Sequence, residues 1–108
     1  MIDKLYKIAE GLSVRFPDGH DPFQIVTRLA EECGEVAAEV NHLEGTGVKV
    51  QKLGAPDRFK LAKELSHVIG AVLHLAIHYD LQAKLEASVD ETYRRVVSEG
   101  LVALLDQE

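Results

Sequence analysis

Cysteine, basic residues and long apolar runs are all scarce in this sequence. Cys33 is the one cysteine among 108 residues, so a disulfide within the chain is excluded. No secretion leader is recognisable at the start, and we therefore expect a reducing, cytoplasmic location. The longest nearly apolar run, residues 68 to 77, contains a histidine and is shorter than the ~20 residues that cross a bilayer, so no membrane partner is expected.

Acidic residues outnumber basic ones. The chain has 18 Asp and Glu against 12 Lys and Arg, which gives a formal charge of −6 at pH 7, and its pI is near 5.3. Binding to the phosphate backbone of a long nucleic acid depends on a surplus of Lys and Arg. The composition therefore argues against DNA or RNA as the main partner.

The chain has the size of one globular domain and the apolar period of helices. With 108 residues, 46% of them hydrophobic, we expect a single domain over residues 1–108. In four stretches of the chain, apolar residues recur every three or four residues, which is the period of a helix. The predicted helices run from Ile2 to before Pro17, from Asp21 to Gly45, from Arg58 to Tyr79 and from Leu81 to Glu99. No strand pattern alternates, and residues 45 to 57 are predicted to form a loop, so the predicted fold is all-α and four-helix bundle-like.

These helices carry apolar stripes that need cover. The fourth helix is predicted to turn Leu81, Leu85, Val89 and Val96 inward. The third helix is apolar nearly all round, so we expect it to be covered within a homodimer or homotetramer. The tail from Leu101 to Leu105 is also apolar, and we expect it to dock on the bundle or on a second subunit. The stripe of the second helix, in which Cys33 is expected to pack as a small hydrophobe, comprises Val26, Leu29, Ala30, Cys33, Val36, Ala37, Val40 and Leu43.

Carboxylates cluster on the second helix. Glu31, Glu32 and Glu35 are three or four residues apart, so they project from neighbouring positions of one side. The third helix offers Glu64 and, three residues on, His67. If the two helices pack antiparallel, these groups face one another across a groove. Clustered carboxylates are hard ligands that suit Mg²⁺ or Mn²⁺, which take a substrate phosphate to complete their shell.

Charge is segregated along the chain. No Lys or Arg lies between Arg28 and Lys49, and basic residues then follow, with a further pair near the C-terminus. Acidic residues that hold a metal ion, with basic side chains nearby, could form a binding site for a polyphosphate. The alternative interpretation is a solvated glutamate-rich helix face with no ligand. The basic residues considered for phosphate binding are Lys49, Lys52, Lys63, Arg94 and Arg95.

The two acidic segments resemble a known enzyme family. E-E-C-G-E at residues 31 to 35, followed after a loop by E-L-S-H at residues 64 to 67, resembles the E-E-x-x-E and E-x-x-D signature of the MazG-like all-α nucleoside triphosphate pyrophosphohydrolase superfamily. The flanking sequence also resembles the family's core helices. The matching segments are L-A-E-E-C-G-E-V-A-A-E-V, K-E-L-S-H-V-I-G-A-V-L-H-L-A and Y-D-L-Q-A-K-L. The resemblance extends from about Phe23 to Arg95.

The resemblance implies an oligomeric, Mg²⁺- or Mn²⁺-dependent enzyme that hydrolyses a nucleotide to a monophosphate and pyrophosphate. Carried over by position, Glu32, Glu35 and Glu64 would be metal ligands and Glu31 the residue that activates water. His67 stands where the motif has aspartate, as a fourth ligand. Any of the loop lysines, or Arg94 and Arg95, would neutralise phosphates.

His67 departs from the pattern. Imidazole is neutral and softer than carboxylate, so it removes one negative charge and favours a transition metal over Mg²⁺. His74 and His78 return to the same side of the helix, where three histidines either extend a metal site or hydrogen-bond to neighbours.

Two further functions stay open beside pyrophosphate hydrolysis. One is a catalytically impaired relative that binds nucleotide or metal. The other is a helical interaction module whose apolar surfaces dock a partner.

Overall fold

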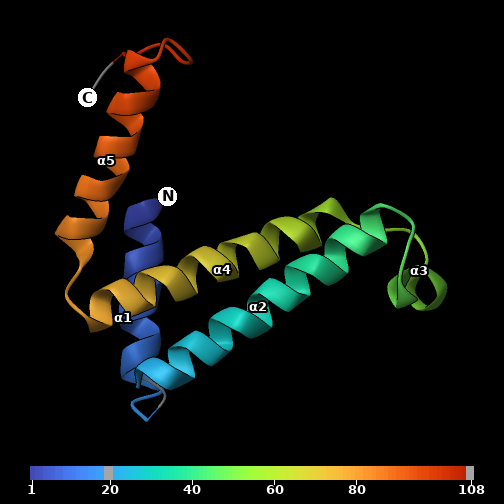
Figure 1. Cartoon of the computed structure of the whole chain (residues 1–108). Coiled ribbons are helices and arrows are strands. Elements are labelled where there is room, and N and C mark those ends of the chain that lie inside the picture. Colours follow the sequence, from blue (N-terminus) through green and yellow to red (C-terminus); the bar gives the residue numbers. More distant parts are fainter. Residues whose placement is uncertain (19–20, 107–108) are drawn as a thin grey trace.

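The computed structural model describes residues 1–18 and 21–106, and within them the chain forms five α-helices and no strand (Figure 1). The all-α prediction is confirmed, and the four long helices begin and end within two residues of the predicted positions. A short helix inside the predicted loop was missed. The helices are α1 (Ile2–Arg15), α2 (Pro22–Leu43), α3 (Val48–Leu53), α4 (Arg58–His78) and α5 (Gln82–Ser98).

Local capping explains where the two central helices start. The Asp21 side chain accepts a hydrogen bond from the Gln24 amide at 2.9 Å, and Pro22 occupies the first turn of α2. Asp57 caps α4 in the same way through the Phe59 amide, also at 2.9 Å. Gly47 precedes α3 with φ +78, a left-handed conformation that glycine adopts without steric cost.

Helices α2 and α4 run antiparallel side by side, and α1 crosses α4 near its C-terminal end (Figure 1). The buried apolar side chains gather at this crossing, where the core of the chain lies. Burying them stabilises the fold by roughly 1.5–3 kcal/mol for each large aliphatic side chain. They are Leu5, Ala9, Ile25, Ala71, Leu73 and Ala76.

Helix α5 projects away from the other helices and contacts α4 alone among them (Figure 1). The radius of gyration is 17.1 Å, against about 13 Å for a compact domain of this size. Leu85 and Val96 of α5 are half-buried, but Leu81 and Val89 are exposed, and so is the tail from Leu101 to Leu105. The predicted inward stripe of α5 is therefore only partly covered. In the described part of the chain, no helix is long and apolar enough to cross a membrane.

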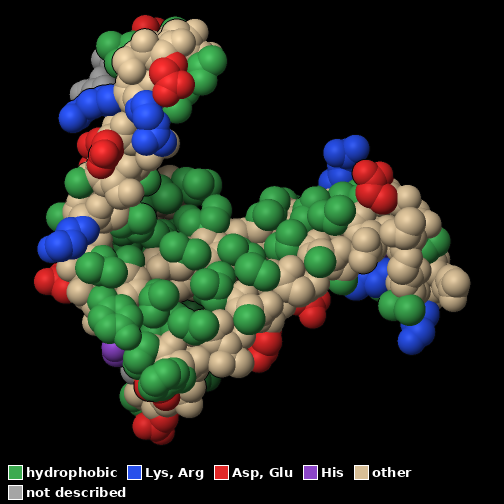
Figure 2. All heavy atoms as spheres, in the orientation of Figure 1, with side chains coloured by type: hydrophobic (Ala, Val, Ile, Leu, Met, Phe, Trp, Pro, Cys, Tyr) green, Lys and Arg blue, Asp and Glu red, His purple; other side chains and the backbone are tan. Residues whose placement is uncertain are grey.

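The stripe predicted to face inward on α2 is only partly covered in the single chain. Leu29, Val36 and Leu43 are half-buried, and its other residues, Cys33 among them, are exposed. The buried residues of α2 are Ile25, Glu39 and His42. Glu39 and Glu32 of α2 pair with Lys49 of α3 and His67 of α4. Exposed hydrophobic side chains of α2 and α4 gather on an outer face (Figure 2).

Candidate metal centre

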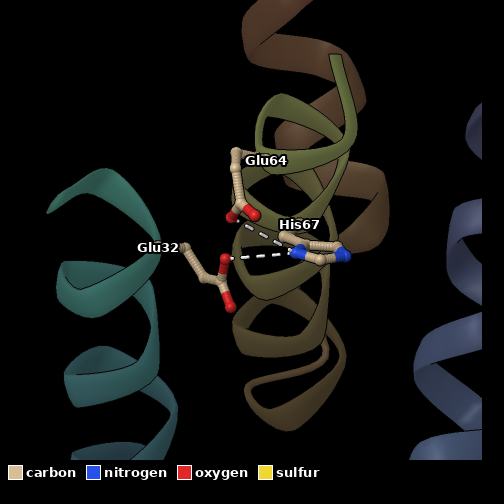
Figure 3. A group of neighbouring side chains, drawn as sticks. All are labelled: Glu32, Glu64 and His67. Carbon is tan, nitrogen blue, oxygen red and sulfur yellow. Dashed lines mark hydrogen bonds and ion pairs between the residues drawn. The ribbon is translucent and has the colours of Figure 1, made fainter. Parts of the chain in front are cut away.

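The antiparallel packing of α2 and α4 brings Glu32 together with Glu64 and His67 (Figure 3). His67 Nδ1 lies 3.2 Å from Glu32 Oε2 and 3.5 Å from Glu64 Oε2. One ligand atom from each of the three residues lies within 4.8 Å of the others. We call these three residues the Glu32–Glu64–His67 cluster.

The cluster is open to solvent. The side chains of Glu32, Glu64 and His67 are 23%, 17% and 43% exposed. Because a carboxylate only accepts, Nδ1 of His67 carries the proton that it shares with them. A divalent cation would take the place of that proton between the same oxygens and nitrogen. Two carboxylates and one imidazole fit Mn²⁺, Co²⁺ or Zn²⁺, whereas Mg²⁺ prefers oxygen alone.

The other two predicted carboxylates lie outside the cluster. Glu35 is exposed one turn further along α2. Glu31, the predicted water-activating residue, is also exposed and lines a separate depression at the start of α2 with Phe23 and Thr27. Helical rotation separates Glu31 from Glu32 by about 100°, so only one of these adjacent residues meets α4.

Helix α3 brings Lys49 back toward the carboxylates of α2. Lys49 Nζ donates to Glu39 Oε2, and this contact raises the pKa of Lys49 above its ordinary 10.5. Burial opposes the rise, while the charges of Glu39, Glu35 and Glu64 add to it in that order. Lys49 is therefore the predicted phosphate-binding lysine that the fold places within the field of the site acids.

Among the described residues, no ion pair joins the remaining predicted cations to the cluster. Lys52 is exposed in the last turn of α3, and Lys63 is exposed on α4. Arg94 and Arg95 are exposed on α5, which does not contact α2.

Glu39 and His42 are functional candidates that the sequence did not single out. They are only 4% and 2% exposed. His42 Nε2 donates to the Gly54 carbonyl oxygen at 2.6 Å, which ties the end of α3 to α2. Nδ1 of His42 lies 4.0 Å from Glu39 Oε1 and has no hydrogen-bond partner among the described residues. One sequence signal could have predicted the pair of Glu39 with Lys49. Lys49 is the first Lys or Arg after a stretch that contains glutamates but no Lys or Arg.

The histidine stripe of α4 does not form one site. His74 is buried, with Nδ1 3.3 Å from Arg28 Nη1 and Nε2 3.2 Å from Ser13 Oγ. The exposed His78 packs edge-on against Tyr79. Hydrogen bonding to neighbours, one of the two interpretations of the stripe, is thus confirmed for His74.

The chain matches no protein-family model, no curated protein and no solved structure.

Proposed function

We propose that this protein is a metal-dependent nucleotide pyrophosphohydrolase of the MazG-like type. The observation that carries the proposal is the convergence of Glu32 from α2 with Glu64 and His67 from α4. These residues occupy the matching positions of the two acidic motifs, E-E-C-G-E and E-L-S-H. Two sequence segments that lie far apart thus supply one candidate ligand set.

Glu32, Glu64 and His67 would hold the cation, with Glu35 adjacent on α2. When bound, the ion would supply charge neutralisation and Lewis acidity to the phosphates. In the reaction a water oxygen bonds to the α phosphorus, the bridging bond to the β phosphate breaks, and pyrophosphate leaves. The motif implies that Glu31 accepts the proton of that water, although its side chain lines a separate depression in the single chain.

Glu64→Gln tests the ligand set. The amide keeps the shape of the side chain but removes the charge that binds the cation. Mutating a residue that only hydrogen-bonds to a metal ligand typically lowers activity ~10–100-fold. Because Glu64 is a proposed ligand itself, we expect its substitution to lower pyrophosphate release by at least about 100-fold. Release is measured from a panel of ribo- and deoxyribonucleoside triphosphates, with Mg²⁺, Mn²⁺, Co²⁺ and Zn²⁺ supplied separately, alongside calorimetry of Mn²⁺ binding without nucleotide.

Glu91→Gln, an exposed carboxylate of α5, is the matched control and should leave both readouts unchanged. Turnover by Glu64→Gln equal to that of the wild type would contradict the assignment. Mn²⁺ binding without release from any nucleotide would favour the second function, a catalytically impaired relative that binds metal or nucleotide. The contact of His67 Nδ1 with both carboxylates, at a position where the motif has aspartate, is the observation behind that alternative.

We also propose that a second copy of the chain covers the outer apolar face of α2 and α4. The open arrangement of α5 and the exposed apolar tail support this assembly. A four-helix bundle would then be completed between subunits, with α2 and α4 of each chain at its centre.

A further inference from the structure

A cavity of about 290 Å³ adjoins the Glu32–Glu64–His67 cluster. Glu32 and His67 belong both to the cluster and to the cavity wall. In Figure 3 the His67 ring turns one nitrogen to the two carboxylates and the other toward the side on which α1 lies. A ligand in the cavity would therefore end at the candidate metal centre.

The wall of the cavity is mostly aliphatic. Helix α1 contributes Leu5, Ile8 and Leu12, while Gly70 and Ala71 of α4 leave room opposite them. Small-molecule sites usually measure ~300–1,000 Å³, so this cavity is at the small end of that range. Its size and its aliphatic wall suit one flat heterocycle with its sugar.

Arg28 also lines the cavity, and residues of the surrounding helices define the orientation of its side chain. A guanidinium has N–H donors and no acceptor, so Nδ1 of His74 accepts from Arg28 and is unprotonated. Nε2 of His74 then carries the proton and donates to Ser13 Oγ. Residues from α1 and α4 thereby hold Arg28 of α2 in place, one turn before Glu32.

We propose that this cavity holds the nucleoside end of the substrate and that Arg28 determines base specificity by selecting bases with oxo groups on their recognition edge. The inference rests on the proposed function, because Glu32 and His67 fix where the phosphates lie. Every hydrogen bond that Arg28 offers a base has to meet an acceptor. A carbonyl oxygen satisfies it, whereas an exocyclic amino group opposes donor to donor in a partly desolvated site.

Uridine and cytidine nucleotides are the matched probes, because uridine has a 4-oxo group and N3–H where cytidine has a 4-amino group and an unprotonated N3. The proposed contact of Arg28 is with the group at position 4. Binding is measured by calorimetry with Mn²⁺ and non-hydrolysable analogues of UTP and CTP that carry a methylene bridge between the α and β phosphorus atoms. The wild type is expected to bind the uridine analogue at least about tenfold more tightly.

In Arg28→Met we expect this ratio to fall close to one. Arg28→Gln presents both a donor and an acceptor, so it should bind the cytidine analogue more tightly than the wild type does. Arg58→Met, an exposed arginine at the start of α4, is the control and should retain the wild-type ratio. Circular dichroism melting of each variant confirms that it folds.

Three results would overturn the inference: no preference in the wild type, an equal loss of both analogues in Arg28→Met, or no analogue binding to the Mn²⁺-loaded protein. The second result would make Arg28 a phosphate contact. Titration with Mn²⁺ alone separates these failures from failure of the proposed function. Loss of the metal site abolishes Mn²⁺ binding, whereas an error about Arg28 leaves it intact in every Arg28 variant.

Discussion

At the scale of the residue, one imidazole distinguishes the Glu32–Glu64–His67 cluster from a site built of carboxylates alone. His67 contacts both glutamates through Nδ1, so any cation bound there exchanges an oxygen ligand for a nitrogen. Nitrogen ligands favour transition metals, whereas Mg²⁺ is held by oxygen. The metal preference of the site should therefore depend on this residue.

His67→Asp should shift the preference toward Mg²⁺. The substitution restores an all-oxygen set, and we expect the ratio of activity in Mg²⁺ to activity in Zn²⁺ or Mn²⁺ to rise by on the order of 10-fold. Pyrophosphate release with each metal measures it, with the exposed His78→Asp as control. An unchanged ratio would show that His67 is not a ligand, whereas release gained from a silent wild type would support the impaired relative.

At the scale of the element, the short helix α3 is attached to α2 by two polar contacts. Lys49 pairs with the buried Glu39, and His42 donates to the Gly54 carbonyl. A buried carboxylate is costly unless it is paired, so the lysine of α3 stabilises the burial of Glu39 on α2. The attachment also keeps the ammonium group near the site acids.

Lys49→Met should lower stability at neutral pH and remove an alkaline transition. Because the folded state raises the pKa of Lys49, its contribution is fully present below the ordinary value of 10.5 and is lost as pH rises through the folded pKa. The free energy of unfolding of the wild type should therefore fall above about pH 10.5, and the difference between wild type and variant should narrow there.

Urea unfolding measured between pH 7 and pH 12 tests this expectation, with Lys52→Met of the same helix as the control. A difference between wild type and Lys49→Met that stays constant across this range would show that the pair with Glu39 does not stabilise the fold.

The same variant should bind Mn²⁺ more tightly, because a competing positive charge is gone.

At the scale of the whole molecule, the chain leaves much apolar surface uncovered. Leu65 and Val72, seven residues apart on one side of α4, are 46% and 39% exposed. Figure 2 shows hydrophobic side chains spread over α2 and α4 on one face. Contiguous apolar patches larger than a few hundred Å² mark interaction sites in soluble proteins.

Leu65→Asp should dissociate the proposed assembly. A charge placed in an apolar interface loses its hydration without a partner, which disfavours association by several kcal/mol, roughly. Sedimentation equilibrium should show an oligomer for the wild type and a monomer for the variant. Lys60→Asp, on another side of α4, should stay oligomeric. A monomeric wild type at micromolar concentration would contradict the assembly.

Local signals in the sequence determined the helices and half of the candidate site. Helix caps and breaks depend on residues only a few positions away, so the sequence alone predicted the ends of the long helices. The signals are Asp21 with Pro22, Asp57 and the glycines after α2. The proximity of Glu64 to His67 also follows from a three-residue spacing on one helix. No comparable signal marked α3, whose six residues are too few to show a period.

Only the tertiary structure decided which face of α2 meets α4. The sequence offers Glu31, Glu32 and Glu35 as near equivalents, but the rotation of α2 about its axis brings Glu32 alone to Glu64 and His67. That rotation accompanies the packing of α2 against α4 and α3, through residues distant in sequence. It buries Glu39 and places Arg28 in the cavity wall. It also leaves the apolar stripe only partly covered, because helical periodicity defines a stripe but not the neighbour that covers it.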